Sequence, residues 1–136
     1  MSIESHATVM VVHHELRVCQ LFEEILSKEG YRAVSATNGA RALLMAMETR
    51  PDIILLDSVM PHLDGLGILR DLRTRGHQGT VILLTAQGTL QGAREAMTLG
   101  AYDYITKPFN LDFLKSVLRE GLESRLPKRR ANVCVH

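Results

Sequence analysis

The sequence lacks the features that mark several large classes of protein. It has no tryptophan and only three tyrosines and three phenylalanines in 136 residues, so its core must be mainly aliphatic. Its 16 basic and 15 acidic residues give a net charge of +1, which argues against nucleic-acid binding through positive charge spread over the whole surface. Two cysteines, Cys19 and Cys134, make a poor disulfide framework and are typical of a reducing compartment.

Long hydrophobic runs are also absent. The longest uninterrupted apolar run, residues 42–47, is far shorter than the ~20 residues that a membrane helix needs. Polar residues at positions 4–6 precede any sustained apolar segment, which argues against a secretory signal. We therefore expect one cytoplasmic domain without a membrane segment, since domains commonly have ~100–200 residues.

Three short apolar runs, at residues 9–12, 53–56 and 81–84, predict buried β-strands. They are too short for buried helices and do not alternate, which favours parallel strands covered on both faces. Two weaker strands are expected at residues 31–36, at an edge of the sheet, and at residues 102–106.

In the segments that follow these strands, apolar residues recur at helical spacing. Asn38 is a favourable N-cap for the second helix, and Gly92 weakens the fourth, which is expected over residues 89–99. The inward positions of the other helices are expected to be Val18, Leu21, Phe22 and Ile25, then Ala40, Leu43, Leu44 and Met47, then Leu66, Leu69 and Leu72, and finally Leu111, Leu114, Val117, Leu118 and Leu122. Five β-α units in succession predict a doubly wound α/β fold with right-handed crossovers.

The ends of the expected strands carry chemically active side chains. In an open parallel sheet, ligands bind outside the carboxyl ends of the strands, where the strand order reverses. His13 with His14, Asp57, Thr85 and Lys107 occupy these positions. Each alone has an ordinary interpretation, such as a strand cap or a surface ammonium. Together they suit phosphoryl transfer, because a carboxylate nucleophile needs a cation and a hydrogen-bond donor to hold the phosphoryl oxygens.

Four segments carry a family resemblance: DIILLD at 52–57, MPHLDG at 60–65, LLTA at 83–86 and GAYDYITKPF at 100–109. In this order and at these spacings, residues 8–125 resemble the receiver domain of bacterial two-component response regulators. Residues 88–89 and 95–101 are most similar to receivers of the nitrogen-regulation type, which precede an ATPase and a DNA-binding module. The resemblance implies a flavodoxin-like five-stranded sheet in the order 2-1-3-4-5. We expect residues 1–126 to form the receiver domain and residues 127–136 a basic tail or linker.

The resemblance also implies roles for individual residues. Asp57 would accept a phosphoryl group from a phosphohistidine of a sensor histidine kinase, and Lys107, before a cis Pro108, would pair with the phosphoryl oxygens. Thr85 would move to hydrogen-bond to the phosphoryl group, and Tyr104 would change rotamer in response. The fourth helix, fifth strand and fifth helix would then signal to an output domain or partner protein, as in transcription regulation. The domain would be a regulatory phosphoacceptor and not an enzyme, would not bind nucleic acid directly, and could form a homodimer.

One departure from the family pattern stands out. Receivers normally end the first strand with two adjacent acids that hold Mg²⁺, and here the matching residues are His13 and His14. Mg²⁺ prefers oxygen ligands, whereas neutral imidazole favours Zn, Cu, Ni or Fe. We therefore expect impaired Mg²⁺ binding.

Four alternatives follow from this replacement, and the first two are favoured. The domain could be a pseudo-receiver that acts by protein contact without phosphorylation. Phosphorylation could instead persist with a metal held by Asp57 and the backbone carbonyl of Val59, helped by Glu15. A protonated His13 or His14 could replace the missing cation, since an imidazole has a pKa of ~6.5. Lastly, His14, Asp57 and His13 could bind a transition metal, but neighbouring strand residues point to opposite faces, so further ligands would be needed.

Other distinctive residues have ordinary structural interpretations. We expect Met45, Met47 and Met97 to fill the core and Cys19 to be a small buried apolar residue. His62 is expected in a solvent-exposed loop.

Overall fold

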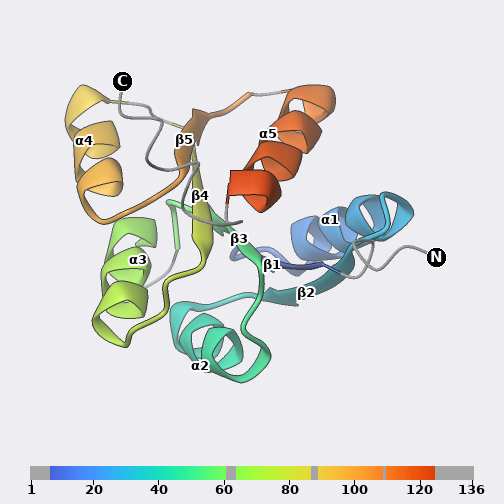
Figure 1. Ribbon diagram of the computed structural model, residues 1–136, viewed down its shortest axis with the longest axis horizontal. Helices are drawn as coiled ribbons and strands as arrows, with labels where there is room; N and C mark the ends of the chain where they lie inside the picture. The colour runs from blue at the N-terminus through green and yellow to red at the C-terminus, as the bar shows by residue number, and fades with distance from the viewer. Residues whose placement is uncertain (1–6, 61–63, 87–88, 109, 125–136) are drawn as a thin grey trace.

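The computed structural model describes residues 7–60, 64–86, 89–108 and 110–124, in which five strands alternate with five helices (Figure 1). The strands are β1 (Thr8–Val12), β2 (Arg32–Ala36), β3 (Ile53–Asp57), β4 (Thr80–Thr85) and β5 (Asp103–Thr106). The helices are α1 (Leu16–Lys28), α2 (Gly39–Thr49), α3 (Gly65–Thr74), α4 (Leu90–Thr98) and α5 (Leu111–Ser124). His62 and the expected tail at 127–136 lie outside the described residues.

The five strands form one parallel sheet in the order β2-β1-β3-β4-β5, which confirms the predicted doubly wound fold. The register brings the carboxyl ends of the strands level, because Val12 pairs with Leu56 and Thr85 pairs with Thr106. The strand order reverses between β1 and β3. A ligand site is therefore expected where these two strands end.

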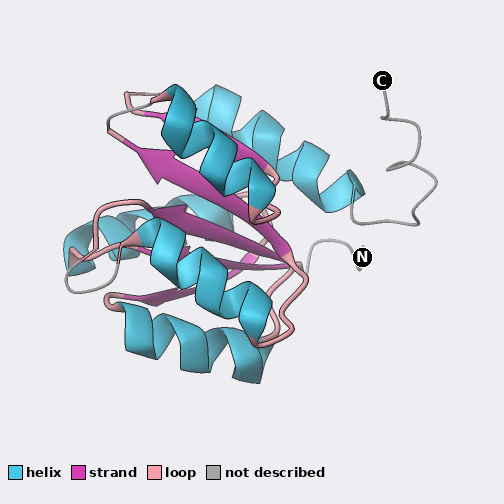
Figure 2. Ribbon diagram, turned by 90° about the vertical axis from the view of Figure 1, so that its left-hand side faces the viewer, coloured by secondary structure: helices cyan, strands magenta, loops and turns pink. Residues whose placement is uncertain are grey.

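Helices cover both faces of the sheet, with α2, α3 and α4 on one side and α1 and α5 on the other (Figures 1 and 2). Successive strand residues point to opposite faces, and both sets are buried. Met10, Ile54 and Leu83 face the first group of helices, whereas Val11, Leu55 and Ile82 face the second. This double burial explains why the central strands are continuous apolar runs.

The predicted inward faces are partly wrong in α1 and α2, and in α5 at Leu111, which is 37% exposed. Leu21, Leu44 and Met47 are exposed to 55%, 56% and 40%, and Ala40 is exposed as well. The buried positions are Cys19 and Leu26 in α1, and Ala42, Leu43 and Ala46 in α2. In α4, Ala96 is fully buried while Met97 is 51% exposed. Alanines make up much of the buried side of α2 and α4, whereas helical spacing had placed Leu44 and Met47 inward in α2 and Met97 had been expected to fill the core.

Side-chain oxygens cap the starts of α2, α3, α4 and α5, the last through Asn110. Asn38 accepts a hydrogen bond from the backbone N–H of Arg41 at 2.8 Å, which confirms the predicted cap of α2. Asp64 caps α3 and Thr89 caps α4 in the same way. The cap at Asp64 fixes the start of the helix that follows the end of β3.

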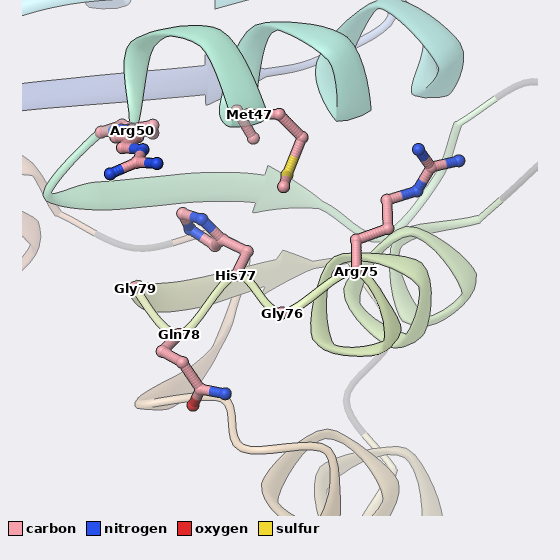
Figure 3. A pocket seen from close by; sticks show the side chains of 9 residues that line it. Met47, Arg50, Arg75, Gly76, His77, Gln78 and Gly79 are labelled. Carbon is pink, nitrogen blue, oxygen red and sulfur yellow. The ribbon is translucent and has the colours of Figure 1, made fainter.

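A cavity of about 480 Å³ lies between the end of α2 and the segment that enters β4 (Figure 3). Pro51 and Gly79, which line it, precede β3 and β4, so it lies at the opposite end of the sheet from Asp57. His77 lines the same cavity, and its Nε2 is buried without a hydrogen-bond partner among the described residues.

The stability of the protein is expected to fall in mild acid because of His77. Burial lowers the pKa of His77 below 6.5, and the nearby positive charge of Arg73 lowers the pKa further. Below pH ~6.5 the unfolded chain therefore binds a proton that the folded chain resists, and the free energy of unfolding decreases. Urea denaturation between about pH 7.5 and about pH 5.5 should show a smaller decrease for His77→Gln than for the wild type. Equal decreases would contradict this assignment.

Candidate functional site

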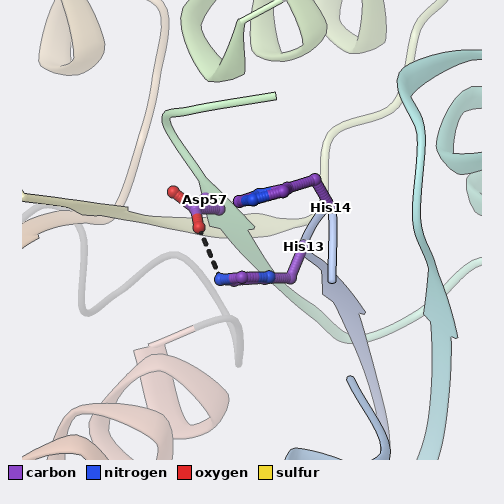
Figure 4. Close-up of side chains that lie close together, drawn as sticks. All are labelled: His13, His14 and Asp57. Atoms are coloured by element: carbon purple, nitrogen blue, oxygen red, sulfur yellow. Dashed lines mark ion pairs between the residues drawn. The ribbon is translucent and has the colours of Figure 1, made fainter. Parts of the chain in front are cut away.

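Asp57, the last residue of β3, is 1% exposed, and both of its carboxylate oxygens accept hydrogen bonds. Oδ1 accepts from the backbone N–H of Val59 at 3.0 Å. Oδ2 accepts from Lys107 Nζ at 3.1 Å, and His13 Nε2 lies 2.9 Å from the same oxygen, the contact drawn in Figure 4. Residues from the ends of β1, β3 and β5 therefore meet at one buried carboxylate.

Lys107 and Thr85 lie beside each other at the ends of β5 and β4. The backbone N–H of Lys107 donates to the carbonyl of Thr85 at 2.7 Å, and the bond from Lys107 to Pro108 is cis, as the resemblance implied. Thr85 is buried, and its neighbour Leu84 pairs with Asp57 in the sheet. The structure thus carries the ammonium, the hydroxyl-bearing residue and the carboxylate on adjacent strand ends.

The two imidazoles lie on the same side of the backbone, contrary to the sequence prediction. The rings of His13 and His14 are stacked, with centroids 4.8 Å apart and an interplanar angle of 14° (Figure 4). Strand alternation does not apply here, because β1 ends at Val12 and both histidines follow it. One ligand atom from each of His13, His14 and Asp57 lies within 4.8 Å of the others.

The contacts of His13 favour a neutral imidazole. Its Nδ1 accepts a hydrogen bond from the backbone N–H of Glu15 at 3.0 Å, so the proton of the neutral ring belongs on Nε2, which lies 2.9 Å from Asp57 Oδ2. Burial lowers the pKa of His13 below 6.5, and this effect outweighs the opposing influence of the Asp57 charge. For His13, these contacts argue against the alternative in which a protonated imidazole replaces the missing cation.

This donor set does not fit Mg²⁺. The close group of potential ligands contains two imidazole nitrogens and one carboxylate, whereas Mg²⁺ demands near-octahedral oxygen ligands. Glu15, the nearest remaining acid in the sequence, does not belong to this group in the described part of the chain.

Two glycines shape the site in ways that sequence reasoning missed. A Cβ on Gly65 would lie 2.7 Å from the backbone oxygen of Asp57 and from Cα of Ser58, so only glycine lets α3 begin this close to the end of β3. A Cβ on Gly92 would lie 2.6 Å from the hydroxyl oxygen of Tyr104. From the sequence, Gly92 was interpreted only as a residue that weakens the fourth helix. Its close approach to Tyr104 depends on a tertiary contact that sequence periodicity cannot reveal.

The parallel sheet has the order β2-β1-β3-β4-β5, and its adjacent strand ends carry a buried carboxylate, a lysine and a threonine. This arrangement defines a doubly wound α/β protein with an acidic site at its topological switch point. The family model described as the response regulator receiver domain matches residues 9–119. The chain therefore belongs to the response regulator receiver family, as the sequence resemblance indicated.

Individual relatives agree with this assignment. The chain is 33% identical over 114 residues to sporulation initiation phosphotransferase F of Bacillus subtilis, covering 84% of this chain and 92% of that protein. It is 32% identical over 121 residues to the regulatory protein AtoC of Escherichia coli, covering 89% of this chain and 26% of AtoC. The solved structure of NtrX from Brucella abortus matches with a TM-score of 0.82 and 31% identity, covering 93% of this chain and 30% of that one. The similarity to AtoC and NtrX confirms the predicted resemblance to nitrogen-regulation receivers.

The extent of these matches differs between relatives. The chain spans only 26% to 55% of the length of several regulatory proteins that it matches. None of the helices that the structure describes has the length and hydropathy of a membrane-spanning segment.

Proposed function

We propose that this receiver accepts a phosphoryl group on Asp57 from a phosphohistidine of a sensor histidine kinase, in the cytoplasm. The observation that carries the proposal is the buried Asp57 carboxylate with Lys107 Nζ at 3.1 Å. Residues 1–126 form the receiver, and residues 127–136 form a linker or tail. Labelling the full chain with acetyl phosphate and weighing it intact tests the proposal, and a gain of one phosphoryl mass is expected.

The transfer uses the residues at the strand ends. A carboxylate oxygen of Asp57 attacks phosphorus, a P–O bond forms, and the bond from phosphorus to the donor imidazole nitrogen breaks, with the electron pair leaving on that nitrogen. The resulting acyl phosphate adds negative charge to the site. Lys107 compensates part of that charge, and the Thr85 hydroxyl donates to a phosphoryl oxygen.

The signal leaves through the face formed by α4, β5 and α5. Support comes from a cavity of about 400 Å³ lined by residues of β5 and the start of α5, including Tyr104 and Phe113, and Phe113 is 49% exposed. Movement of Thr85 toward a phosphoryl group changes the space beside Tyr104, one strand away. The differential contacts of the phosphoryl group with the two arrangements shift the population between them. An output domain or partner protein that binds this face responds to the change in population.

Replacing Gly92 with alanine is expected to displace the Tyr104 side chain. The added Cβ would lie 2.6 Å from the Tyr104 hydroxyl oxygen, while alanine alone favours the helix by about 1 kcal/mol. In Tyr104→Phe, which lacks this hydroxyl, Gly92→Ala should therefore raise the free energy of unfolding more than it does in the wild type. Urea denaturation of the four proteins in this cycle measures the coupling, expected at about 0.5 kcal/mol or more. Additive effects would contradict the contact.

The metal preference of the site is expected to be altered as well. Because His13 and His14 replace two acids, we propose that the domain holds Mg²⁺ weakly. Imidazoles suit a transition metal better, but the cluster offers three ligand groups, one fewer than a closed tetrahedral site needs. Binding of a transition metal is therefore the competing outcome when metal binding to the domain is measured.

A pseudo-receiver that never accepts a phosphoryl group is the second candidate function. It is favoured by the hydrogen bond from Lys107 to Oδ2 of Asp57 and by His13 Nε2, which lies 2.9 Å from the same oxygen. In that case the α4-β5-α5 face binds its partner constitutively. Acetyl phosphate separates the two candidates, because a folded pseudo-receiver gains no mass with or without Mg²⁺.

A further inference from the structure

The cavity at the end of the sheet where β3 and β4 begin is lined by positive charge (Figure 3). Its volume of about 480 Å³ is in the range of cavities that hold small organic molecules. Arg50 and Arg75 line it, and none of the other described residues in its wall is acidic. Within the described part of the chain, neither guanidinium takes part in an ion pair. The wall therefore carries two positive charges that no acidic residue in the wall balances.

The backbone of Arg50 makes its side chain the more informative of the two. Arg50 follows α2 in the left-handed conformation, with φ of 47° and ψ of 62°. Glycine adopts this conformation without steric cost, whereas other residues adopt it at a cost. The guanidinium makes no hydrogen bond or ion pair to another residue that the structure describes, so no polar contact of this kind offsets the cost. A negatively charged ligand in the cavity would supply such a contact.

A third arginine adds positive charge beside the cavity. Arg73 in α3 donates hydrogen bonds to four backbone carbonyls, those of His77, Gly79, Leu99 and Gly100. All four acceptors are neutral, so these contacts leave the charge of Arg73 without an acid to cancel it. Burial and the charge of Arg73 lower the pKa of His77 below 6.5, so the imidazole in the wall is neutral at pH 7.

The arrangement of the wall indicates the shape of the ligand. Figure 3 shows Arg50 and Arg75 on opposite sides of Met47, whose thioether extends from α2 into the space between them. Met47 is 40% exposed, and Ala46 and Pro51 add further apolar surface to the wall. Two cationic ends with an apolar wall between them match a molecule that has a negative group at each end and an apolar chain in the middle.

The charge at each end favours carboxylates. One guanidinium forms two parallel hydrogen bonds to one planar carboxylate, and their unit charges cancel. A phosphate monoester carries nearly two negative charges, which a single arginine at each end would not balance. The neutral imidazole of His77 adds no further charge.

We propose that this cavity binds an aliphatic dicarboxylate, with one carboxylate on Arg50, the other on Arg75 and the chain against Met47. The site lies at the opposite end of the sheet from Asp57, so the proposal does not rest on the phosphoacceptor function. Exposed ion pairs contribute little individually, and we expect a dissociation constant of about 1 mM.

Binding is measured by titrating the full chain with glutarate, adipate, pimelate and suberate at constant ionic strength. In ¹H–¹⁵N correlation spectra, the amide signals of wall residues such as Met47, Gly76 and His77 are expected to shift, and the affinity should be greatest at one chain length. The monocarboxylate of that chain length should bind at least about threefold more weakly, as the loss of one exposed ion pair implies.

Two variants remove one end of the site each. Arg50→Gly suits the left-handed backbone and should fold, and Arg75→Gln changes an exposed side chain after α3. Each should lower the affinity for the best dicarboxylate by about threefold or more, since each removes one ion pair. Arg41→Gln removes an exposed charge of α2 that does not line the cavity, and this matched control should bind like the wild type.

Several results would overturn the proposal. They are equal affinity for the dicarboxylate and the monocarboxylate at every chain length, no binding below about 10 mM, and amide shifts that lie only outside the wall. Unchanged affinity in folded Arg50→Gly or Arg75→Gln has the same meaning. If Arg41→Gln weakens binding as much as these variants do, general attraction to positive charge explains the binding and the site is rejected. Tighter binding of inorganic phosphate at the same residues would overturn the assignment of carboxylates.

Discussion

An Asp57→Asn variant is expected to lose phosphoryl labelling, with a rate at least about 100-fold below that of the wild type, because a neutral amide is a poor nucleophile. The side chains have nearly the same shape, so the contacts of Val59 and Lys107 impose no new steric conflict. The variant also removes the one negative charge that Lys107 faces at 3.1 Å. Incubation with acetyl phosphate followed by intact mass measurement gives the result directly.

A second asparagine variant provides the control. Asp64→Asn makes the same chemical change at the start of α3, where asparagine caps a helix as well as aspartate does. It is expected to label like the wild type. Labelling that persists in Asp57→Asn would show that another residue accepts the phosphoryl group.

The double variant His13→Asp/His14→Asp is expected to gain Mg²⁺ binding. Two carboxylates beside Asp57 supply the oxygen ligands that Mg²⁺ prefers and add two negative charges that the ion can neutralise. The affinity for Mg²⁺ should rise at least about tenfold, which corresponds to about 1.4 kcal/mol. Labelling of this variant should stop in EDTA and recover with Mg²⁺.

The single variant His14→Asp is the matched comparison for this prediction. It adds one acid but keeps the His13 imidazole beside Asp57, so its gain in Mg²⁺ affinity should be smaller than that of the double variant. If the double variant folds and binds Mg²⁺ no better than the wild type, the histidines are not the cause of weak metal binding.

The fold could be predicted because its signals are local. The runs that became β1, β3 and β4 are apolar since both faces of the sheet are covered, and residues that follow parallel strands share one edge. This reasoning was sufficient to predict that Asp57 and Lys107, 50 positions apart, would lie together.

The finer geometry depends on contacts that leave no periodic signal. The stacking of His13 on His14 follows from β1 ending at Val12, and the tautomer of His13 follows from a single backbone N–H. Neither could be predicted from residue types. The contact between Gly92 and Tyr104 was likewise hidden, because a missing side chain is significant only when its neighbour is known.

The location of the phosphoryl group after labelling tests the central claim most directly. The full chain is treated with acetyl phosphate, the acyl phosphate is reduced with borohydride, and the modified residue is identified by peptide mass spectrometry. We predict a single modification at position 57. A modification at any other aspartate, or at a glutamate, would contradict the assignment of Asp57 as the phosphoacceptor.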